Sequence, residues 1–178
     1  GALDPLLAFR HGVFNSIRGA IYFHTIYLAI CLIAFFIWLN APFLSLTAFL
    51  IYSAIHFGGD WQDTPLKGLF YGLFVLSMPI YLSPQEAKNI FQAITFHHQV
   101  DTILSYAPAV FYCSCLTLMW CIASDFKRYI RLALETSFLF TISSVCDPLN
   151  YFVVYFCFLH SPKHLYNCLL YTSDAADE

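Results

Sequence analysis

Charged residues are scarce in this chain. Only 11% of its 178 residues are Asp, Glu, Lys or Arg, whereas 60% are hydrophobic, and the mean hydropathy is +0.67. A typical soluble domain carries about 25% charged residues, so too few charges remain here to solvate a globular surface. The eight basic residues form no basic patch, which argues against a nucleic-acid partner. The composition therefore predicts a protein whose solvent is the lipid bilayer.

Paired cysteine motifs are also absent from the sequence. There are seven cysteines but no C-x-x-C pair, the spacing that zinc sites and redox-active dithiols commonly show. Cys31, Cys121 and Cys157 lie inside apolar runs. We therefore expect reduced thiols that pack as small apolar side chains, rather than disulfides or a zinc site.

The apolar residues fall into six segments. A helix that spans a bilayer needs about 20 apolar residues, with about 17 as the lower limit. We expect an all-α, polytopic integral membrane bundle of about six transmembrane helices, forming a single domain over residues 1–170. The segments lie near Ile21–Leu39, Pro42–Phe57, Leu66–Leu82, Leu104–Ala123, Tyr129–Val145 and Leu149–His160.

Two connections carry helix-boundary signals. Asn40-Ala41-Pro42 predicts a tight turn between the first two segments. Ser83-Pro84-Gln85-Glu86 predicts a capping box, with serine as N-cap, proline at N1 and glutamate at N3. It opens an amphipathic stretch that we expect to lie in the membrane interface. The apolar residues of this stretch are Ala87, Ile90, Phe91, Ile94 and Leu104.

The basic residues predict the orientation. In this topology every Lys and Arg except Lys88 falls on one side of the membrane, and the positive-inside rule places that side in the cytoplasm. We therefore expect a multi-pass protein of the plasma membrane. Several residues with metal-site chemistry fall on the same cytoplasmic side, namely Asp4, His56, Asp60, His160 and His164.

Three histidines, His56, His160 and His164, lie at or just past the ends of apolar runs. Imidazole at the edge of hydrocarbon is costly unless it is paired, hydrogen-bonded or bound to a metal. His160 and His164 are four residues apart, which places them on one face of a helix. The three are therefore candidate metal ligands, and hydrogen-bonded or snorkelling histidines remain the alternative.

Two neighbours qualify this interpretation. Asp60 follows His56 by four residues, and a ligating histidine usually donates its second N–H to a carboxylate, so we expect Asp60 to orient His56. Pro162 interrupts the His160–His164 pair: either one strained helix continues through it, or a new helix begins with Ser161 as N-cap. Glu135, inside an apolar segment, should face the bundle.

Both ends of the chain look unusual. Residues 171–178 are polar and acidic after an apolar run, and they resemble a translated adapter sequence. We expect this tail to be non-native and the chain to be a fragment at both ends.

Three blocks of sequence resemble the Brp/Blh family of integral-membrane β-carotene dioxygenases from rhodopsin-bearing microbes. Two of them, Ser53–Asp60 and Tyr155–His164, resemble the best-known blocks of the family. The opening Gly1–Asp4 resembles the end of the family's first block, whose histidine would stand just before Gly1. The resemblance spans nearly the whole chain, from Gly1 to His164.

The resemblance implies an enzyme with a non-haem Fe²⁺ held by His56, His160 and His164. Such an enzyme would cleave the central double bond of β-carotene with O2 and give two all-trans-retinal molecules, which would pass to a rhodopsin. We assign Asp4 and Asp60 to orienting the ligands. Without the first-block histidine, we expect the chain to be inactive alone. Candidate residues for lining the substrate path are Phe57, Tyr151 and Tyr155.

Three alternatives stay open. Another membrane iron oxygenase, of the desaturase or hydroxylase type, would show several histidine boxes, and only His97-His98 hints at one. A haem-binding membrane protein would use His56 and His160 as axial ligands. A transporter would use Glu135 and the histidines as proton carriers.

Overall fold

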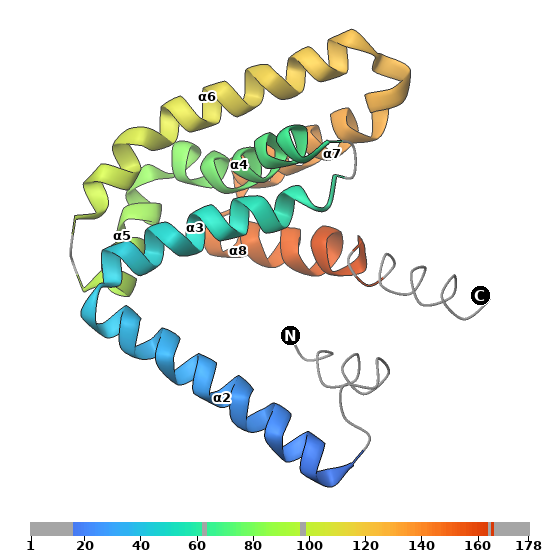
Figure 1. Cartoon of the computed structure of the whole chain (residues 1–178). Helices are drawn as coiled ribbons and strands as arrows, with labels where there is room; N and C mark the ends of the chain where they lie inside the picture. The colour runs from blue at the N-terminus through green and yellow to red at the C-terminus, as the bar shows by residue number, and fades with distance from the viewer. Residues whose placement is uncertain (1–15, 62–63, 97–98, 164, 166–178) are drawn as a thin grey trace. The chain divides into compact units, whose positions relative to one another are not determined.

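The computed structural model describes residues 16–61, 64–96, 99–163 and 165, and these ranges contain helices and their connections but no strand (Figure 1). The expected all-α class is therefore confirmed for them. The chain divides into two compact units, residues 1–45 and 46–178. Asp4, His164 and residues 171–178 lie outside the described residues. The helices are α2 (Ile17–Asn40), α3 (Pro42–Gly58), α4 (Pro65–Leu82), α5 (Pro84–Thr95), α6 (Val100–Ser124), α7 (Phe126–Val145), α8 (Pro148–Val154) and the π-helical η1 (Tyr155–His160).

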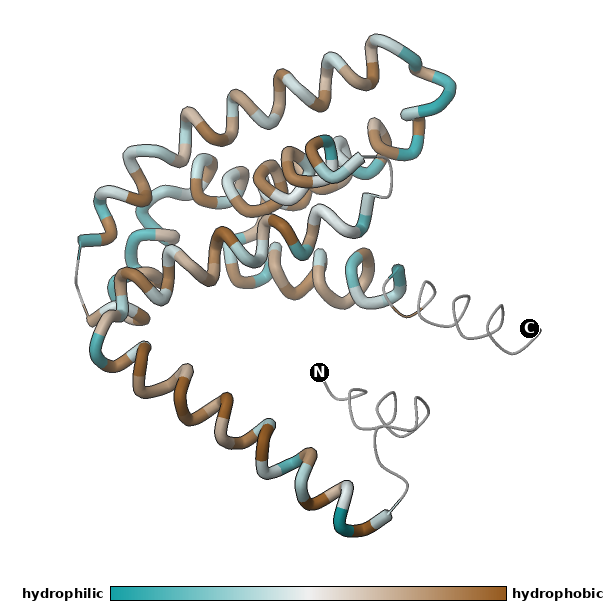
Figure 2. The backbone as a smooth tube through the Cα atoms, in the orientation of Figure 1, coloured by the Kyte–Doolittle hydropathy of each residue, from teal (hydrophilic) through white to brown (hydrophobic). Residues whose placement is uncertain are grey.

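The first unit contains α2 and the start of α3. The Ser16 hydroxyl caps α2 by accepting a hydrogen bond of 3.2 Å from the Gly19 N–H. The helix ends at Asn40, and α3 begins two residues later at Pro42, where proline suits the first helical position. The predicted tight turn is therefore confirmed. Figure 2 shows that α2 is apolar along most of its length.

Among the described residues, three helices are long and apolar enough to cross a membrane: α2, α4 and α6. The apolar α3 has 17 residues and falls short of the length criterion. α7 is long enough, but its first turns carry Lys127, Arg128 and Arg131. α8 has only seven residues before η1 begins. The prediction of about six spans is thus not confirmed, whereas apolar helices compatible with a membrane protein are present.

The core of the second unit is built around α4. This helix contacts α5, α6, α7 and α8 (Figure 1), and Tyr71, Val75 and Met78 on it are fully buried. In a bilayer such burial stabilises the bundle through van der Waals packing, because lipid is as apolar as the core. The core formed this way includes Phe111 of α6 and Leu132 of α7.

Small residues bring α3 and α4 into close contact. A Cβ atom added at Gly72 would lie 1.8 Å from the Ala54 carbonyl oxygen, and one added at Gly68 would lie 2.5 Å from that of Gly58. Real Cβ atoms do not approach backbone so closely, so glycine is required at these positions on α4. A small-x-x-x-small spacing is a known device for close helix packing in membranes. This contact runs antiparallel and fixes the C-terminal end of α3, which carries His56.

The predicted capping box is confirmed in its positions, with Ser83 as the N-cap of α5, Pro84 at its start and Glu86 in its first turn. Its hydrogen bond is not formed, because the Ser83 side chain makes no capping contact. The reason is that Ser83 also ends α4, where its N–H bonds to the Pro79 carbonyl at 3.0 Å, and its ψ of 62° is far from the extended value that an N-cap needs. α5 then ends at Thr95, so Leu104 belongs to α6 instead of the amphipathic stretch.

The helix before His160 widens into a π turn. Asp147 caps α8 through bonds of 3.0 Å from the N–H groups of Leu149 and Asn150. The Ser161 N–H bonds to the Phe156 carbonyl, and Ser161 has helical dihedral angles, so it is not an N-cap. Of the two interpretations of Pro162, the continuous helix is correct. A π turn accommodates the missing N–H of proline at the cost of one wider turn.

Candidate functional site

The structure brings two of the three predicted metal ligands together. His56 lies in the last turn of α3 and His160 ends η1, and their ring centroids are 5.0 Å apart with an interplanar angle of 67°. His160 is only 4% exposed. The rings of Phe57 and Phe156 pack on it at 5.0 and 5.1 Å. His164 lies outside the described residues.

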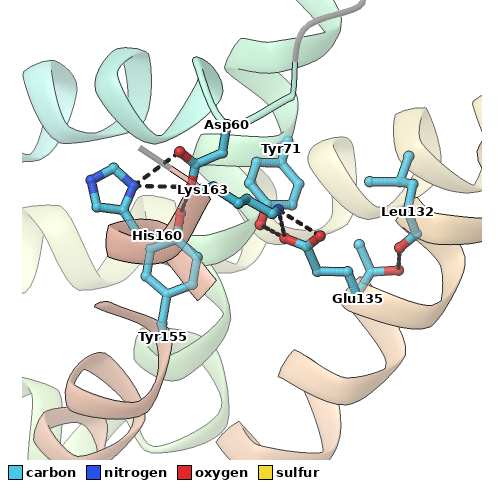
Figure 3. Close-up of polar contacts among 8 residues, drawn as sticks. Asp60, Tyr71, Leu132, Glu135, Tyr155, His160 and Lys163 are labelled. Carbon is cyan, nitrogen blue, oxygen red and sulfur yellow. Dashed lines mark hydrogen bonds and ion pairs between the residues drawn. The ribbon is translucent and has the colours of Figure 1, made fainter. Parts of the chain in front are cut away.

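Asp60 holds the buried ring of His160 (Figure 3). Its two carboxylate oxygens lie 3.0 and 2.9 Å from His160 Nδ1, and the Tyr155 hydroxyl donates to Oδ2 at 2.9 Å. The side chains of Asp60 and His160 are 6% and 5% exposed. An ionised carboxylate only accepts hydrogen bonds, so Nδ1 is the donor, and in the neutral ring this leaves the lone pair on Nε2.

The partner of Asp60 differs from the one that the spacing predicted. A separation of four residues places two side chains on one face only while the helix continues. α3 ends at Gly58, and the Asp60 N–H bonds to the Phe57 carbonyl in a turn, so Asp60 has already left the helix. Its carboxylate reaches the end of η1 instead of lying along the face of α3.

A second polar group adjoins the first in Figure 3. Lys163 donates to both carboxylate oxygens of Glu135, at 2.5 and 2.6 Å, and the Tyr71 hydroxyl donates to the same carboxylate. The Glu135 side chain is 11% exposed, so the prediction that it faces the bundle is confirmed. Neither Lys163 nor Tyr71 was predicted as a site residue, because their partner lies on another helix and no local spacing reveals it.

Of the three predicted substrate-lining residues, only Phe57 lines an apolar cavity in the part of the chain that the structure describes. Tyr151 and Tyr155 are fully buried, and the Tyr151 hydroxyl donates to the Val75 carbonyl at 3.1 Å. Phe57 differs, because it faces an apolar cavity as well as the His160 ring.

This apolar cavity has a volume of about 280 Å³ and lies among α3, α4, α5 and α8 with η1. We call it the α3–α5 cavity. One face of α3 lines it, and Phe156 of η1 completes the wall near His160. Among the described residues that line the cavity, Ser53 is the only polar one. The described residues that line it are Leu46, Phe49, Leu50, Ser53, Phe57, Leu76, Pro79, Ile80, Ala87, Ile90, Phe91, Ile94, Pro148, Leu149, Phe152 and Phe156.

The donor set suits a metal as far as the structure describes it. No group of three or more His, Cys, Asp or Glu side chains is arranged around a metal-sized position within the described residues, from which His164 is missing. The two described imidazoles are adjacent, and one of them donates its second N–H to a carboxylate, as metal-binding histidines usually do. Imidazole nitrogens are good ligands for iron, zinc and copper.

Comparisons with known proteins identify the family of the chain. The sequence model of the family described as beta-carotene 15,15'-dioxygenase matches residues 1–177. A curated protein named "Beta-carotene 15,15'-dioxygenase", from Uncultured marine bacterium 66A03, is 27% identical over 149 residues, which cover 78% of this chain. The match covers 53% of that relative, so the chain spans about half its length. No solved structure matches the chain. The family match extends over almost all of the sequence and confirms the resemblance drawn from its three blocks: the chain belongs to the beta-carotene 15,15'-dioxygenase family.

Proposed function

We propose that this protein cleaves the central double bond of β-carotene with O2 and releases two all-trans-retinal molecules. The observation that carries the proposal is the pair His56 and His160, with Asp60 fixing one ring, beside an apolar cavity whose lining residues Phe57 and Phe156 contact His160. Titratable groups and space for a hydrocarbon therefore lie on the two sides of the same aromatic rings. The name of the family supplies the substrate class.

Fe²⁺ is the metal that this reaction needs, and His56, His160 and His164 are the residues we assign to hold it. When bound, iron supplies the electronic chemistry that lets O2 react with an alkene. The chain's own contribution is placement. Asp60 holds the proton of His160 on Nδ1, which keeps Nε2 available as a donor atom. Asp4 stays a predicted orienting residue.

The residues around the pair exclude water and receive hydrocarbon. Phe57 and Phe156 pack against His160 on one side and line the α3–α5 cavity on the other. A hydrocarbon placed there would lie in a dry environment against the rings of Phe57 and Phe156, one aromatic ring away from His160. β-Carotene has no polar group, so we infer that it enters from the bilayer. We propose a multi-pass plasma-membrane protein with its site near the cytoplasmic side, whose retinal passes to a rhodopsin.

The experiment is to express the complete gene that encodes this chain in cells that make β-carotene, and to separate the extracted pigments by chromatography. We expect retinal from the unchanged protein and none from His160→Ala. Asp101→Asn serves as the control, because Asp101 is a mostly exposed residue of a surface ion pair. The iron content of the purified protein should fall in His160→Ala and stay unchanged in the control. Retinal formation by His160→Ala at the level of the unchanged protein would refute the proposal.

A further inference from the structure

We propose that the α3–α5 cavity holds one ring of β-carotene with the adjoining part of its polyene, and that the depth of this cavity selects the bond that is cleaved. The inference rests on the proposed function. β-Carotene is symmetric and has no polar group, so no hydrogen bond or charge can mark its centre. An enzyme can locate that centre only by shape, by stopping one ring at a fixed distance from the reacting site.

The cavity is lined along α3 as far as Phe57, whose ring contacts His160. Its lining on this helix, from Leu46 through Leu50 and Ser53 to Phe57, follows helical spacing along one face. The eleven-residue step from Leu46 to Phe57 corresponds to about 16 Å of helix. Phe57 contacts His160, so that end of the cavity is the reacting end. An extended polyene half with its ring is a rod of comparable length.

The volume fits one end of the substrate and excludes the whole molecule. A cavity of about 150 Å³ lined by Leu, Ile and Phe is known to bind benzene, and pockets for whole drug-sized ligands begin at about 300 Å³. The α3–α5 cavity has about 280 Å³. It therefore has room for a methyl-substituted ring and part of the chain, and the other half of the molecule must lie beyond the histidines.

Buried side chains line the cavity at the end of α3 that is far from His56. The antiparallel contact pairs Gly68 with Gly58 and Gly72 with Ala54. If the same antiparallel pairing continues along α4, Ile80 lies opposite Leu46 on α3. Both residues line the cavity. Ala87 follows shortly after on α5. Leu46 and Ala87 are each 2% exposed, so we infer that they form the stop against which the ring rests.

The test changes the stop in both directions and measures products. Ala87→Phe fills the far end, and Leu46→Ala deepens it. A displaced ring brings a different double bond to the histidines, so both variants should release unequal aldehyde pairs in addition to retinal. One methylene in an apolar pocket changes discrimination by about 10-fold or more, and we expect the ratio of unequal products to retinal to rise by at least that factor.

The matched control uses a second cavity. Ala107 of α6 lines a cavity of about 300 Å³ bordered by α3, α4 and α6, and is 6% exposed. Ala107→Phe introduces the same bulk there and should leave the product ratio unchanged. The ratio does not depend on how much protein folds, so a poorly expressed variant still gives a reading, and Leu46→Ala adds no bulk that could block folding.

The outcomes separate the two proposals. Retinal from the unchanged protein, with unequal products in the two stop variants and only retinal in Ala107→Phe, supports the stop. Retinal as the sole product of Leu46→Ala, or the same unequal products from Ala107→Phe, would overturn it while the proposed function stands. Absence of retinal from the unchanged protein would overturn the proposed function itself.

Discussion

Replacing Glu135 by glutamine should destabilise the protein far more than breaking a surface ion pair. The substitution keeps the shape of the side chain and removes its charge. Glutamine keeps one acceptor oxygen and has an NH2 donor in place of the other, so Lys163 loses one of its contacts of 2.5 and 2.6 Å together with its charged partner, and Tyr71 loses a charged acceptor. Removing one partner of a buried ion pair costs about 3–5 kcal/mol. The Lys163 side chain is 31% exposed, so water solvates part of the unpaired charge. We therefore expect the free energy of unfolding to fall by about 2–3 kcal/mol.

The assay is thermal unfolding of the detergent-purified protein encoded by the complete gene. For chains of this length 1 kcal/mol corresponds to about 2–4 °C, so Tm should fall by about 4–12 °C. The matched control is Asp101→Asn, which breaks a Lys88–Asp101 contact of 2.6 Å whose carboxylate is 76% exposed. Exposed pairs contribute about 0–1 kcal/mol. Equal shifts in the two variants would refute the reasoning.

A double variant tests whether the cost comes from the stranded charge. Lys163→Met combined with Glu135→Leu replaces the pair by apolar side chains of similar size. Such replacements of buried pairs are often neutral or stabilising. We therefore expect the double variant to be more stable than Glu135→Gln alone, and a lower Tm for the double variant would contradict this explanation.

Three further predictions follow from the same structure. Gly72→Ala should separate α3 from α4, because the added methyl would lie 1.8 Å from a carbonyl oxygen of α3, and overpacking costs about 1–3 kcal/mol in thermal unfolding. Asp60→Asn should lower the rate of retinal formation by about 10–100-fold, since it weakens the group that orients His160. Hydrogen bonds from the first turn of α8, above all the one from the Asn150 N–H, lower the pKa of Asp147. The ionised cap therefore stabilises α8 fully at a pH above the ordinary pKa of Asp. This stability should be lost as the pH falls through the lowered pKa.

Each of these has a control. Gly59→Ala should cost less than Gly72→Ala, because the added Cβ would lie 3.1 Å from its nearest atom. An Asp60→Asn protein as inactive as His160→Ala would show that Asp60 does more than orient a ring. Asp147→Asn retains a good capping residue and should flatten the acid dependence of thermal stability. An unchanged acid dependence would contradict the role of Asp147.

The helices could be predicted where apolar runs meet strong boundary signals. The break at Asn40-Ala41-Pro42 is an example, because proline fixes the first helical turn. The sequence between α5 and α6 contains no proline or glycine that would predict the end of a helix. The break there depends on Phe96 and Gln99, which adopt φ values of 55° and 44° without being glycine. Only tertiary packing selects that conformation for such residues, so sequence alone extended the amphipathic stretch to Leu104.

The site was predictable to the extent that it depends on burial. Imidazoles at the ends of apolar runs require partners, and this argument predicts His56 and His160 as site residues. The partners themselves come from elsewhere in the chain: Asp60 and His160 meet across 100 residues. Local spacing therefore paired Asp60 with His56, whereas its carboxylate bonds to His160. The Lys163–Glu135 pair and the π turn likewise depend on how α7, α8 and η1 pack.

The central position of α4 affects how the chain would enter a bilayer. Its most apolar window has a mean hydropathy of 1.3, below the 1.5 of α6, and 56% of it is buried, against 28% for α6. A helix shielded by protein needs fewer lipid-soluble side chains, yet the insertion machinery meets α4 before α6 and α7 have been synthesised. If α4 spans the bilayer, it would partition into lipid only marginally on its own and would be stabilised there by the helices that later surround it.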